Sequence, residues 1–169
     1  MNNFQINFED IDVIVSDFDG VMTNNRVYLN SLGEEFVSCN RSDGLALDVL
    51  KKIGKPVFIL STEKDAVVSA RAKKLDIRVI QGITNKAESL KSLSKSENFS
   101  LSNVLYIGND INDFNAMKIC GYSACPADSH KKIKQISNVT LNTKGGDGIF
   151  RELLEEILNL DLIKILYKE

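Results

Sequence analysis

The chain has 169 residues, of which 43% are hydrophobic and 26% charged, and its formal net charge is −2. This composition is typical of a soluble globular protein and predicts one domain with its own core over residues 1–169. The near-neutral charge predicts no nucleic-acid partner, and the apolar runs are too short to predict a membrane span. Residues 1–12 lack the basic-then-apolar order of a signal peptide, so we expect a cytoplasmic protein.

The cysteine and histidine content limits the kinds of metal site and catalytic group that the chain can form. Three cysteines without CxxC spacing, Cys39, Cys120 and Cys125, indicate reduced structural thiols. Together with the single histidine, His130, they are too few and too scattered for a zinc site, and a histidine-based triad is disfavoured. Any catalysis is therefore expected to use carboxylates, hydroxyls and lysines.

The first predicted elements are a strand over residues 11–16 and a β-hairpin. The strand is a β-branched run that ends directly before Asp17. The hairpin is expected over residues 26–40, with short strands at 27–29 and 35–38 around the turn at 30–33. It interrupts an otherwise regular pattern as a small insertion.

The rest of the chain alternates helical patterns with short apolar runs. Because the runs are continuously apolar, they favour parallel strands covered on both faces. The alternation predicts an α/β fold: a three-layer sandwich with a parallel, Rossmann-like sheet, the small hairpin and no cap domain. In chain order we expect helix 45–53, strand 56–60, helix 65–75, strand 78–80, helix 86–93, strand 104–107, helix 113–119, strand 122–124, a weaker strand 139–141 and helix 149–158.

Four polar clusters stand at or just beyond the ends of predicted strands, where parallel sheets bind ligands. Each cluster alone could consist of ordinary caps and turns, but four in this order favour one active-site crevice. Crowded carboxylates suit Mg²⁺, a carboxylate can act as nucleophile, and a hydroxyl and a lysine can hold phosphoryl oxygens. The clusters are Asp17 with Asp19, Ser61 with Thr62, Lys86, and Asn109 with Asp110 and Asp113.

These motifs resemble those of the haloacid dehalogenase superfamily. The chain is similar, from about Val13 to Leu158, to its capless phosphatases of 3-deoxy-octulosonate 8-phosphate and of nine-carbon 2-keto-3-deoxy acid 9-phosphates. It also resembles the C-terminal domain of acylneuraminate cytidylyltransferases. The resemblance rests on Asp17-x-Asp19-Gly20-Val21-x-Thr23, Ser61, Lys86, Gly108-Asn109-Asp110-x-Asn112-Asp113, and the markers at 40–44, 81–82, 144–148 and 150–152.

The resemblance implies a role for each motif. Asp17 would be the nucleophile and a metal ligand, and Asp19 the general acid and base, giving its backbone oxygen to Mg²⁺. Ser61 and Thr62 would contact the phosphoryl group, and Lys86 would neutralise it. The family's tetramers imply a homotetramer in which the hairpin at 26–40 and the loop at 145–148 lie at subunit contacts.

Asn109 departs from the family pattern, which usually places a metal-binding aspartate there. An amide oxygen can ligate Mg²⁺, but one negative charge is lost, for which Asp110 or Asp113 would compensate, directly or through water. The alternative interpretation is a weakly active site.

The segment Ser61-Thr62-Glu63-Lys64 is the second departure. Octulosonate phosphatases typically carry Thr-Gly-Arg here, whereas the nine-carbon enzymes carry Glu in place of that Arg, and Lys74 falls where they place a lysine. The resemblance therefore favours a nine-carbon, sialic-acid-like substrate. The alternative is that Glu63 and Lys74 are merely exposed. The substrate contacts it implies are Asn40, Ser42, Glu63, Lys64 and Lys74.

The leading interpretation is a Mg²⁺-dependent phosphatase of a sugar acid phosphate in bacterial surface-sugar synthesis, including lipopolysaccharide. The alternative is a weakly active or inactive oligomerisation or regulatory domain associated with an acylneuraminate cytidylyltransferase.

Overall fold

A computed structural model describes residues 6–167 of the chain. Its centre is a six-stranded parallel sheet in the order β5-β4-β1-β6-β7-β8. This confirms the predicted α/β sandwich, and the described residues contain no cap domain. A single domain over the whole of residues 1–169 stays a prediction, since 1–5 and 168–169 lie outside the described part. The strands are β1 (Val13–Ser16), β4 (Val57–Leu60), β5 (Arg78–Ile80), β6 (Val104–Ile107), β7 (Tyr122–Cys125) and β8 (Val139–Thr140).

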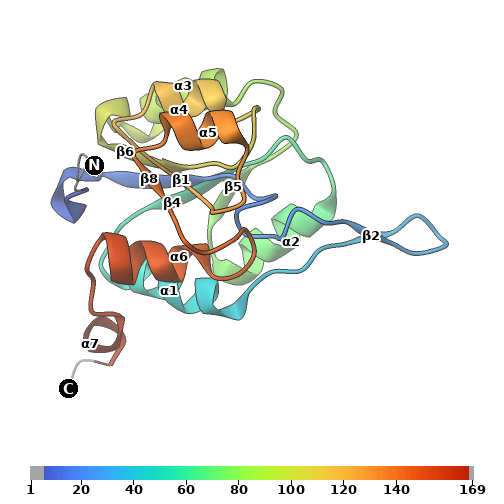
Figure 1. Cartoon of the computed structure of the whole chain (residues 1–169), viewed down its shortest axis with the longest axis horizontal. Helices are drawn as coiled ribbons and strands as arrows, with labels where there is room; N and C mark the ends of the chain where they lie inside the picture. The colour runs from blue at the N-terminus through green and yellow to red at the C-terminus, as the bar shows by residue number, and fades with distance from the viewer. Residues whose placement is uncertain (1–5, 168–169) are drawn as a thin grey trace.

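Helices cover both faces of the sheet, as continuous apolar strands require (Figure 1). Alternate residues of β1 point to opposite faces: Ile14 joins the core beneath α1 and α6, whereas Val13 and Val15 join the core beneath α3, α4 and α5. The helices are α1 (Arg41–Lys52), α2 (Ala66–Leu75), α3 (Lys86–Glu97), α4 (Phe114–Lys118), α5 (Lys131–Ile136), α6 (Ile149–Glu152) and α7 (Leu162–Leu166), with π-helix η3 (Leu153–Ile157) after α6 and 3-10 turns η1 (Phe8–Asp10) and η2 (Leu101–Asn103).

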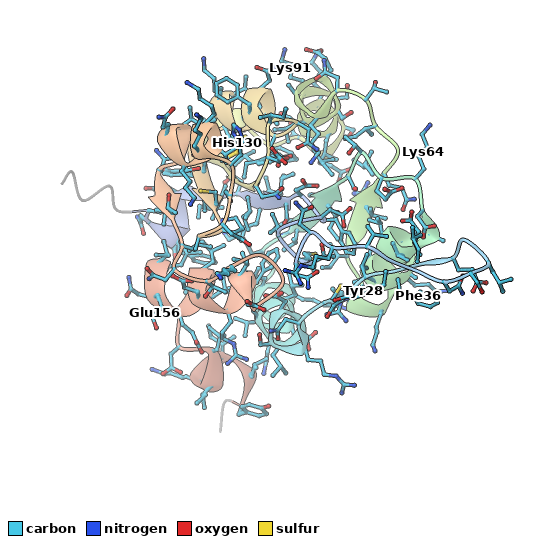
Figure 2. The ribbon with its side chains drawn as sticks, turned by 45° about the vertical axis from the view of Figure 1, so that its right-hand side comes forward. Tyr28, Phe36, Lys64, Lys91, His130 and Glu156 are labelled. Carbon is cyan, nitrogen blue, oxygen red and sulfur yellow. The ribbon has the colours of Figure 1, made fainter. Side chains whose placement is uncertain are left out.

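The hairpin insertion is present but shorter than predicted. Strands β2 (Tyr28–Leu29) and β3 (Glu35–Phe36) pair antiparallel, and the hairpin projects from the body of the molecule (Figure 1). Figure 2 shows Tyr28 and Phe36 on this projection. Several of its apolar side chains are exposed, most of all Leu32 at 81%.

Helix boundaries differ from the prediction where capping outweighs apolar periodicity. Helix α1 begins at Arg41 rather than residue 45, because the Asn40 side chain caps it by accepting a hydrogen bond from the Ser42 amide. Two short helices, α5 and α7, were not predicted, since five or six residues are too few to display a period. No described helix has the length and apolar character that a membrane crossing needs.

Asp43 ties the first turn of α1 to the start of α6. Its side chain is 1% exposed, and Oδ1 accepts a hydrogen bond of 2.9 Å from the Phe150 amide. Burial raises the pKa of the Asp43 carboxyl to about 6, although the hydrogen bond from Phe150 and the charge of Arg71 oppose the rise. The charged form of this carboxyl is therefore unfavourable inside the fold.

Because the pKa of Asp43 is raised from its ordinary value of 3.8 to about 6, the folded state holds this proton more tightly than the unfolded chain does. The contribution of Asp43 to the free energy of unfolding is therefore fully present below pH 3.8 and is lost as the pH rises through about 6. The substitution Asp43→Asn removes this titration. We expect the stability of the variant relative to the parent to improve by about 1 kcal/mol between pH 5 and pH 8. Thermal or urea unfolding at both pH values measures it, with the exposed Asp48→Asn on the same helix as control. A pH-independent difference for Asp43→Asn would contradict the assignment.

Candidate active site

A cleft of about 340 Å³ lies beyond the carboxyl ends of β1, β4 and β6. Most of its walls come from the residues that follow these three strands, and the hairpin supplies Val27, Glu35 and Val37. Since β4, β1 and β6 are neighbours in the sheet, their ends meet at one edge, as predicted. The predicted site residues that line the cleft are Asp17, Asp19, Ser61, Thr62, Glu63, Asn109 and Asp110.

The turn after β1 fixes the two aspartates. The Asp17 amide donates to the Ile107 carbonyl at 2.9 Å, which extends the β1–β6 pairing to the end of the strand. The chain then folds back at Gly20, whose φ of +78° suits glycine. Thr23 holds the turn closed: its Oγ1 accepts from the Gly20 amide at 3.1 Å and donates to Asp19 Oδ1 at 3.2 Å. The Asp19 carboxyl is thereby oriented at the cleft.

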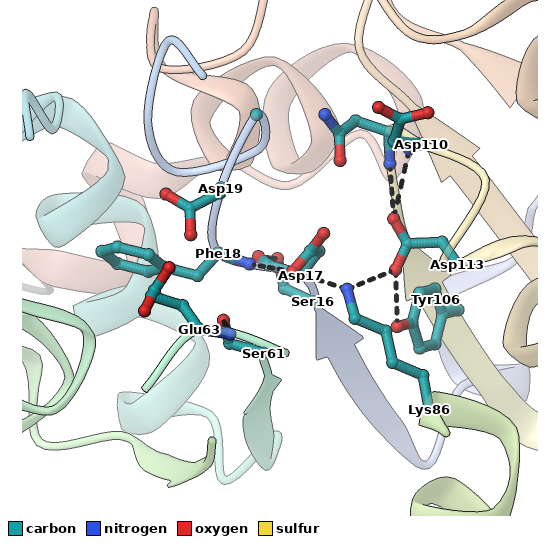
Figure 3. A network of polar contacts seen from close by, with 12 residues as sticks. Ser16, Asp17, Phe18, Asp19, Ser61, Glu63, Lys86, Tyr106, Asp110 and Asp113 are labelled. Carbon is teal, nitrogen blue, oxygen red and sulfur yellow. Dashed lines mark hydrogen bonds and ion pairs between the residues drawn. The ribbon is translucent and has the colours of Figure 1, made fainter. Parts of the chain in front are cut away.

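Lys86 joins two buried carboxylates beneath the cleft. Its Nζ lies 2.7 Å from Asp17 Oδ1 and 2.7 Å from Asp113 Oδ1, and the three side chains are 1%, 5% and 0% exposed (Figure 3). Burial raises the pKa of Asp17, the charge of Asp113 raises it further, and Lys86 opposes both. Burial also disfavours the ammonium, but the two carboxylates outweigh it and raise the pKa of Lys86. Lys86 therefore stays charged in this site.

Asp113 is an anchor for the loop after β6. Its Oδ2 accepts from the backbone amides of Asn109 at 2.9 Å and Asp110 at 3.3 Å. Its Oδ1 accepts from Lys86 Nζ at 2.7 Å and from Tyr106 OH at 2.9 Å. Because four donors already hold this buried carboxylate, the arrangement does not fit the prediction of Asp113 as a direct metal ligand. It fits a residue that shapes the loop and positions Lys86.

Asn109 offers an oxygen that fits a metal. Its Oδ1 is buried in the cleft wall without a hydrogen-bond partner among the described residues, although buried polar atoms are normally paired. Its amide nitrogen lies against Gly20, where an added Cβ would approach it to 1.8 Å. No three His, Cys, Asp or Glu side chains within residues 6–167 group as metal ligands, so any ion here must also use amide or backbone oxygens.

Asp19 differs from Asp17 in its surroundings. Burial raises the pKa of the Asp19 carboxyl, the hydrogen bond from Thr23 lowers it, and the charge of Glu63 raises it again. Figure 3 shows Asp19 and Glu63 on one side of Asp17, with Lys86 and Asp113 on the other. A carboxyl oriented at the cleft in this way can give a proton to a leaving group and later take one from water.

The segment after β4 forms the opposite wall of the cleft. Ser61 is 1% exposed, and its Oγ accepts a hydrogen bond from the Glu63 amide at 3.1 Å. Thr62 and Glu63 also line the cleft. Two hydroxyl-bearing residues and one carboxylate thus line the same cleft as Asp17 and Asn109.

Four of the predicted substrate contacts do not line the cleft. Asn40 caps α1, and Ser42 donates to its Oδ1 at 2.8 Å. Lys64 is exposed and points outward (Figure 2), and Lys74 lines a separate cavity between α1 and α2. Within this protomer, only Glu63 of that predicted set reaches the cleft.

The loop at 144–148 packs inside the protomer, on the turn that carries Asp19. The Gly146 amide donates to the Val21 carbonyl at 2.9 Å, and a Cβ at Gly145 would lie 2.2 Å from the Gly20 carbonyl oxygen. Glycine is thus needed for close approach. Its predicted place at a subunit contact stays a prediction.

Sequence reasoning missed Asn25, just before the hairpin, and Glu35 in its second strand, which line the cleft, and Tyr106, which contacts Asp113. Tyr106 lies inside an apolar strand run, and no local signal distinguishes it from a core aromatic residue.

Comparison with known proteins places the chain among characterised families. Residues 41–153 match the family model of haloacid dehalogenase-like hydrolases. A 3-deoxy-D-manno-octulosonate 8-phosphate phosphatase from Haemophilus influenzae is 30% identical over 155 residues, covering 91% of this chain and 86% of that protein. The N-acylneuraminate cytidylyltransferase A of Danio rerio is 27% identical over 154 residues, which cover 90% of this chain and 36% of that protein.

Among solved structures, the chain is similar to the 3-deoxy-D-manno-octulosonate 8-phosphate phosphatase of Moraxella catarrhalis, a complex with magnesium ion, phosphate ion and KDO. The TM-score is 0.85 and the sequence identity 32%, over 89% of this chain and 87% of that chain.

Proposed function

Because this chain belongs to the haloacid dehalogenase-like hydrolases and is a phosphatase, we propose that it hydrolyses the phosphomonoester of a 2-keto-3-deoxy sugar acid. The observation that carries the proposal is one cleft that joins Asp17, paired to Lys86, with a separately oriented Asp19. The named substrates of the relatives from Haemophilus influenzae and Moraxella catarrhalis support the substrate class.

In the proposed mechanism, an Asp17 oxygen attacks phosphorus and the bond from phosphorus to the sugar oxygen breaks. Asp17 Oδ1 is held by the Phe18 amide and Lys86, both at 2.7 Å, which favours Oδ2 as the attacking oxygen. Asp19 gives its proton to the departing alkoxide, and an aspartyl-phosphate remains on Asp17. Asp19 then takes a proton from water, whose oxygen attacks phosphorus and releases Asp17 and phosphate.

Lys86, Ser61 and Thr62 are proposed to contact the phosphoryl oxygens as negative charge accumulates on them. Asp17, the Asp19 backbone oxygen and Asn109 are proposed to hold Mg²⁺, with Asp110 as an additional carboxylate of the same loop. The ion would supply positive charge to the phosphoryl group. The unpartnered Oδ1 of Asn109 supports this assignment.

Glu63 supports a nine-carbon substrate in preference to an eight-carbon one. It lines the cleft beside Asp19, where an octulosonate phosphatase would typically carry arginine. A carboxylate here accepts hydrogen bonds from substrate hydroxyls, whereas an arginine would donate them. A phosphate-release screen over eight- and nine-carbon sugar acid phosphates with Mg²⁺ tests the class and the preference together. Equal turnover of both lengths would remove the preference, and no turnover of either would remove the substrate class.

A second candidate function is a domain that associates with an acylneuraminate cytidylyltransferase. The match to the Danio rerio enzyme over 90% of this chain favours it, together with the loss of one charge at Asn109. Co-purification with such an enzyme, combined with negligible phosphate release in the same screen, would favour this role over the first.

The nucleophile assignment predicts that Asp17→Asn abolishes turnover while the fold and oligomeric state are kept, because an amide cannot attack phosphorus as a carboxylate does. Phosphate release and thermal unfolding measure the two properties. Asp12→Asn, an exposed carboxylate at the opposite end of β1, is the control and should retain activity. More than a few per cent of residual activity in Asp17→Asn would refute the mechanism.

The proposed metal site predicts that Asn109→Asp binds Mg²⁺ roughly tenfold more tightly, since a full charge replaces a dipole at similar size, offset by added carboxylate repulsion. Activity should rise or hold at low Mg²⁺. Titration of Mg²⁺ against activity and by calorimetry measures both effects, with Asp110→Asn as the matched variant in the same loop. An unchanged Mg²⁺ dependence in Asn109→Asp, with weaker binding in Asp110→Asn, would identify Asp110 as the ligand.

We also propose a homotetramer assembled partly through the hairpin. Tyr28 and Phe36 are each 53% exposed and Leu29 is 67% exposed, which is a large apolar area for a projecting element. Light scattering at micromolar concentration should give a tetramer, and Leu29→Asp with Phe36→Asp should lower the mass. Ile53→Asp, at the far end of α1, is the control and should not change it. A monomeric parent protein would overturn the proposal.

A further inference from the structure

Tyr106 places a hydroxyl group in a part of the core whose other side chains are apolar. It lies in β6, is 0% exposed, and packs among the apolar side chains beneath α3 and α4. Phenylalanine would fill the same space. Since burying a hydroxyl is unfavourable unless it is hydrogen-bonded, the identity of its partner is informative.

That partner is Asp113 Oδ1, which accepts from Tyr106 OH at 2.9 Å (Figure 3). The same oxygen accepts from Lys86 Nζ, and Lys86 in turn contacts Asp17 Oδ1, both at 2.7 Å. The tyrosine hydroxyl is thus connected to the proposed nucleophile through one carboxylate and one ammonium group. None of these side chains is more than 5% exposed.

In this chain of contacts, negatively charged groups outnumber positively charged ones. Two carboxylates, Asp17 and Asp113, share the single ammonium of Lys86. The ammonium has three N–H donors, so Lys86 can contact a phosphoryl oxygen while it keeps both carboxylates, and its single charge is then shared among three anions. The remaining donors to Asp113, the amides of Asn109 and Asp110, serve the other oxygen, Oδ2. Without Tyr106, Oδ1 would lose its only other donor in the described contacts.

We propose that Tyr106 is a positioning residue for phosphoryl transfer: its hydroxyl holds Asp113 Oδ1 so that Lys86 can turn its charge to the phosphoryl group. The hydroxyl stabilises the Asp113 anion without adding a competing charge. This inference rests on the proposed roles of Asp17 and Lys86. It does not depend on which sugar is the substrate.

The test is Tyr106→Phe, assayed on 4-nitrophenyl phosphate with Mg²⁺, a probe that does not involve the sugar. Removing one hydrogen bond to a buried charged group should lower kcat roughly tenfold, while KM changes less than about threefold. The control is Ser123→Ala on β7, which also removes a buried hydroxyl, one bonded to Asn138 rather than to the site. It should lose comparable stability and keep its kcat.

Calorimetric titration of beryllofluoride with Mg²⁺ shows whether Tyr106 acts through Lys86. Tyr106→Phe should weaken beryllofluoride binding roughly tenfold in the parent and less than about threefold in a Lys86→Met background. Equal effects in both backgrounds, or a kcat for Tyr106→Phe equal to that of Ser123→Ala, would overturn the proposal. The Asp17→Asn variant separates the two hypotheses: if it retains turnover, the nucleophile assignment fails, whereas if only Tyr106→Phe retains full turnover, the role of Tyr106 fails.

Discussion

The ammonium of Lys86 lies between Asp17 and Asp113, 2.7 Å from each, where water has almost no access. Two carboxylates at this depth would otherwise repel each other until one took up a proton. The sheet makes the contact possible: β1 and β6 are neighbours, so Asp17 and the loop after β6 emerge side by side. Helix α3 begins with Lys86, which the Asn85 cap fixes in place. The electrostatics of the cleft depend on this shared charge.

Two aspartates only two residues apart acquire different properties from their environments. Burial and the charge of Asp113 raise the pKa of Asp17, and Lys86 and the Phe18 amide oppose the rise only in part. Asp19 sits nearer the surface, has a single hydrogen bond from Thr23, and faces the charge of Glu63. Under the proposed mechanism, the ion pair with Lys86 orients Asp17 as the nucleophile, whereas the less buried position of Asp19 suits a group that exchanges a proton with substrate and water. One tight turn after one strand produces both.

The gathering of the site residues in one cleft was predictable, because it follows from the order of strands in a parallel sheet. Apolar runs ending at Asp17, Ser61 and Asn109 had to meet at one edge of a parallel sheet. The orientation of side chains was not predictable in the same way. The spacing of Asp113 is compatible with a metal ligand or with an anchor, and only its four donors distinguish them. Tyr106 is hidden for a similar reason, since its hydroxyl acts across the core rather than along the chain.

The cleft presents an electrostatic difficulty that bears on Asn109. Within the described residues, its lining contains the carboxylates Asp17, Asp19, Glu35, Glu63 and Asp110, and no Lys or Arg. A phosphorylated acid entering such a cleft is repelled unless cations compensate, and Lys86 is already shared between two carboxylates. Under the proposed metal role, an amide at position 109 weakens attraction for the ion but also removes one charge that would repel the substrate. Under that role, Asn109 lowers the affinity for Mg²⁺ and also lowers the repulsion of the anionic substrate. Which of the two effects dominates the activity depends on the concentration of Mg²⁺.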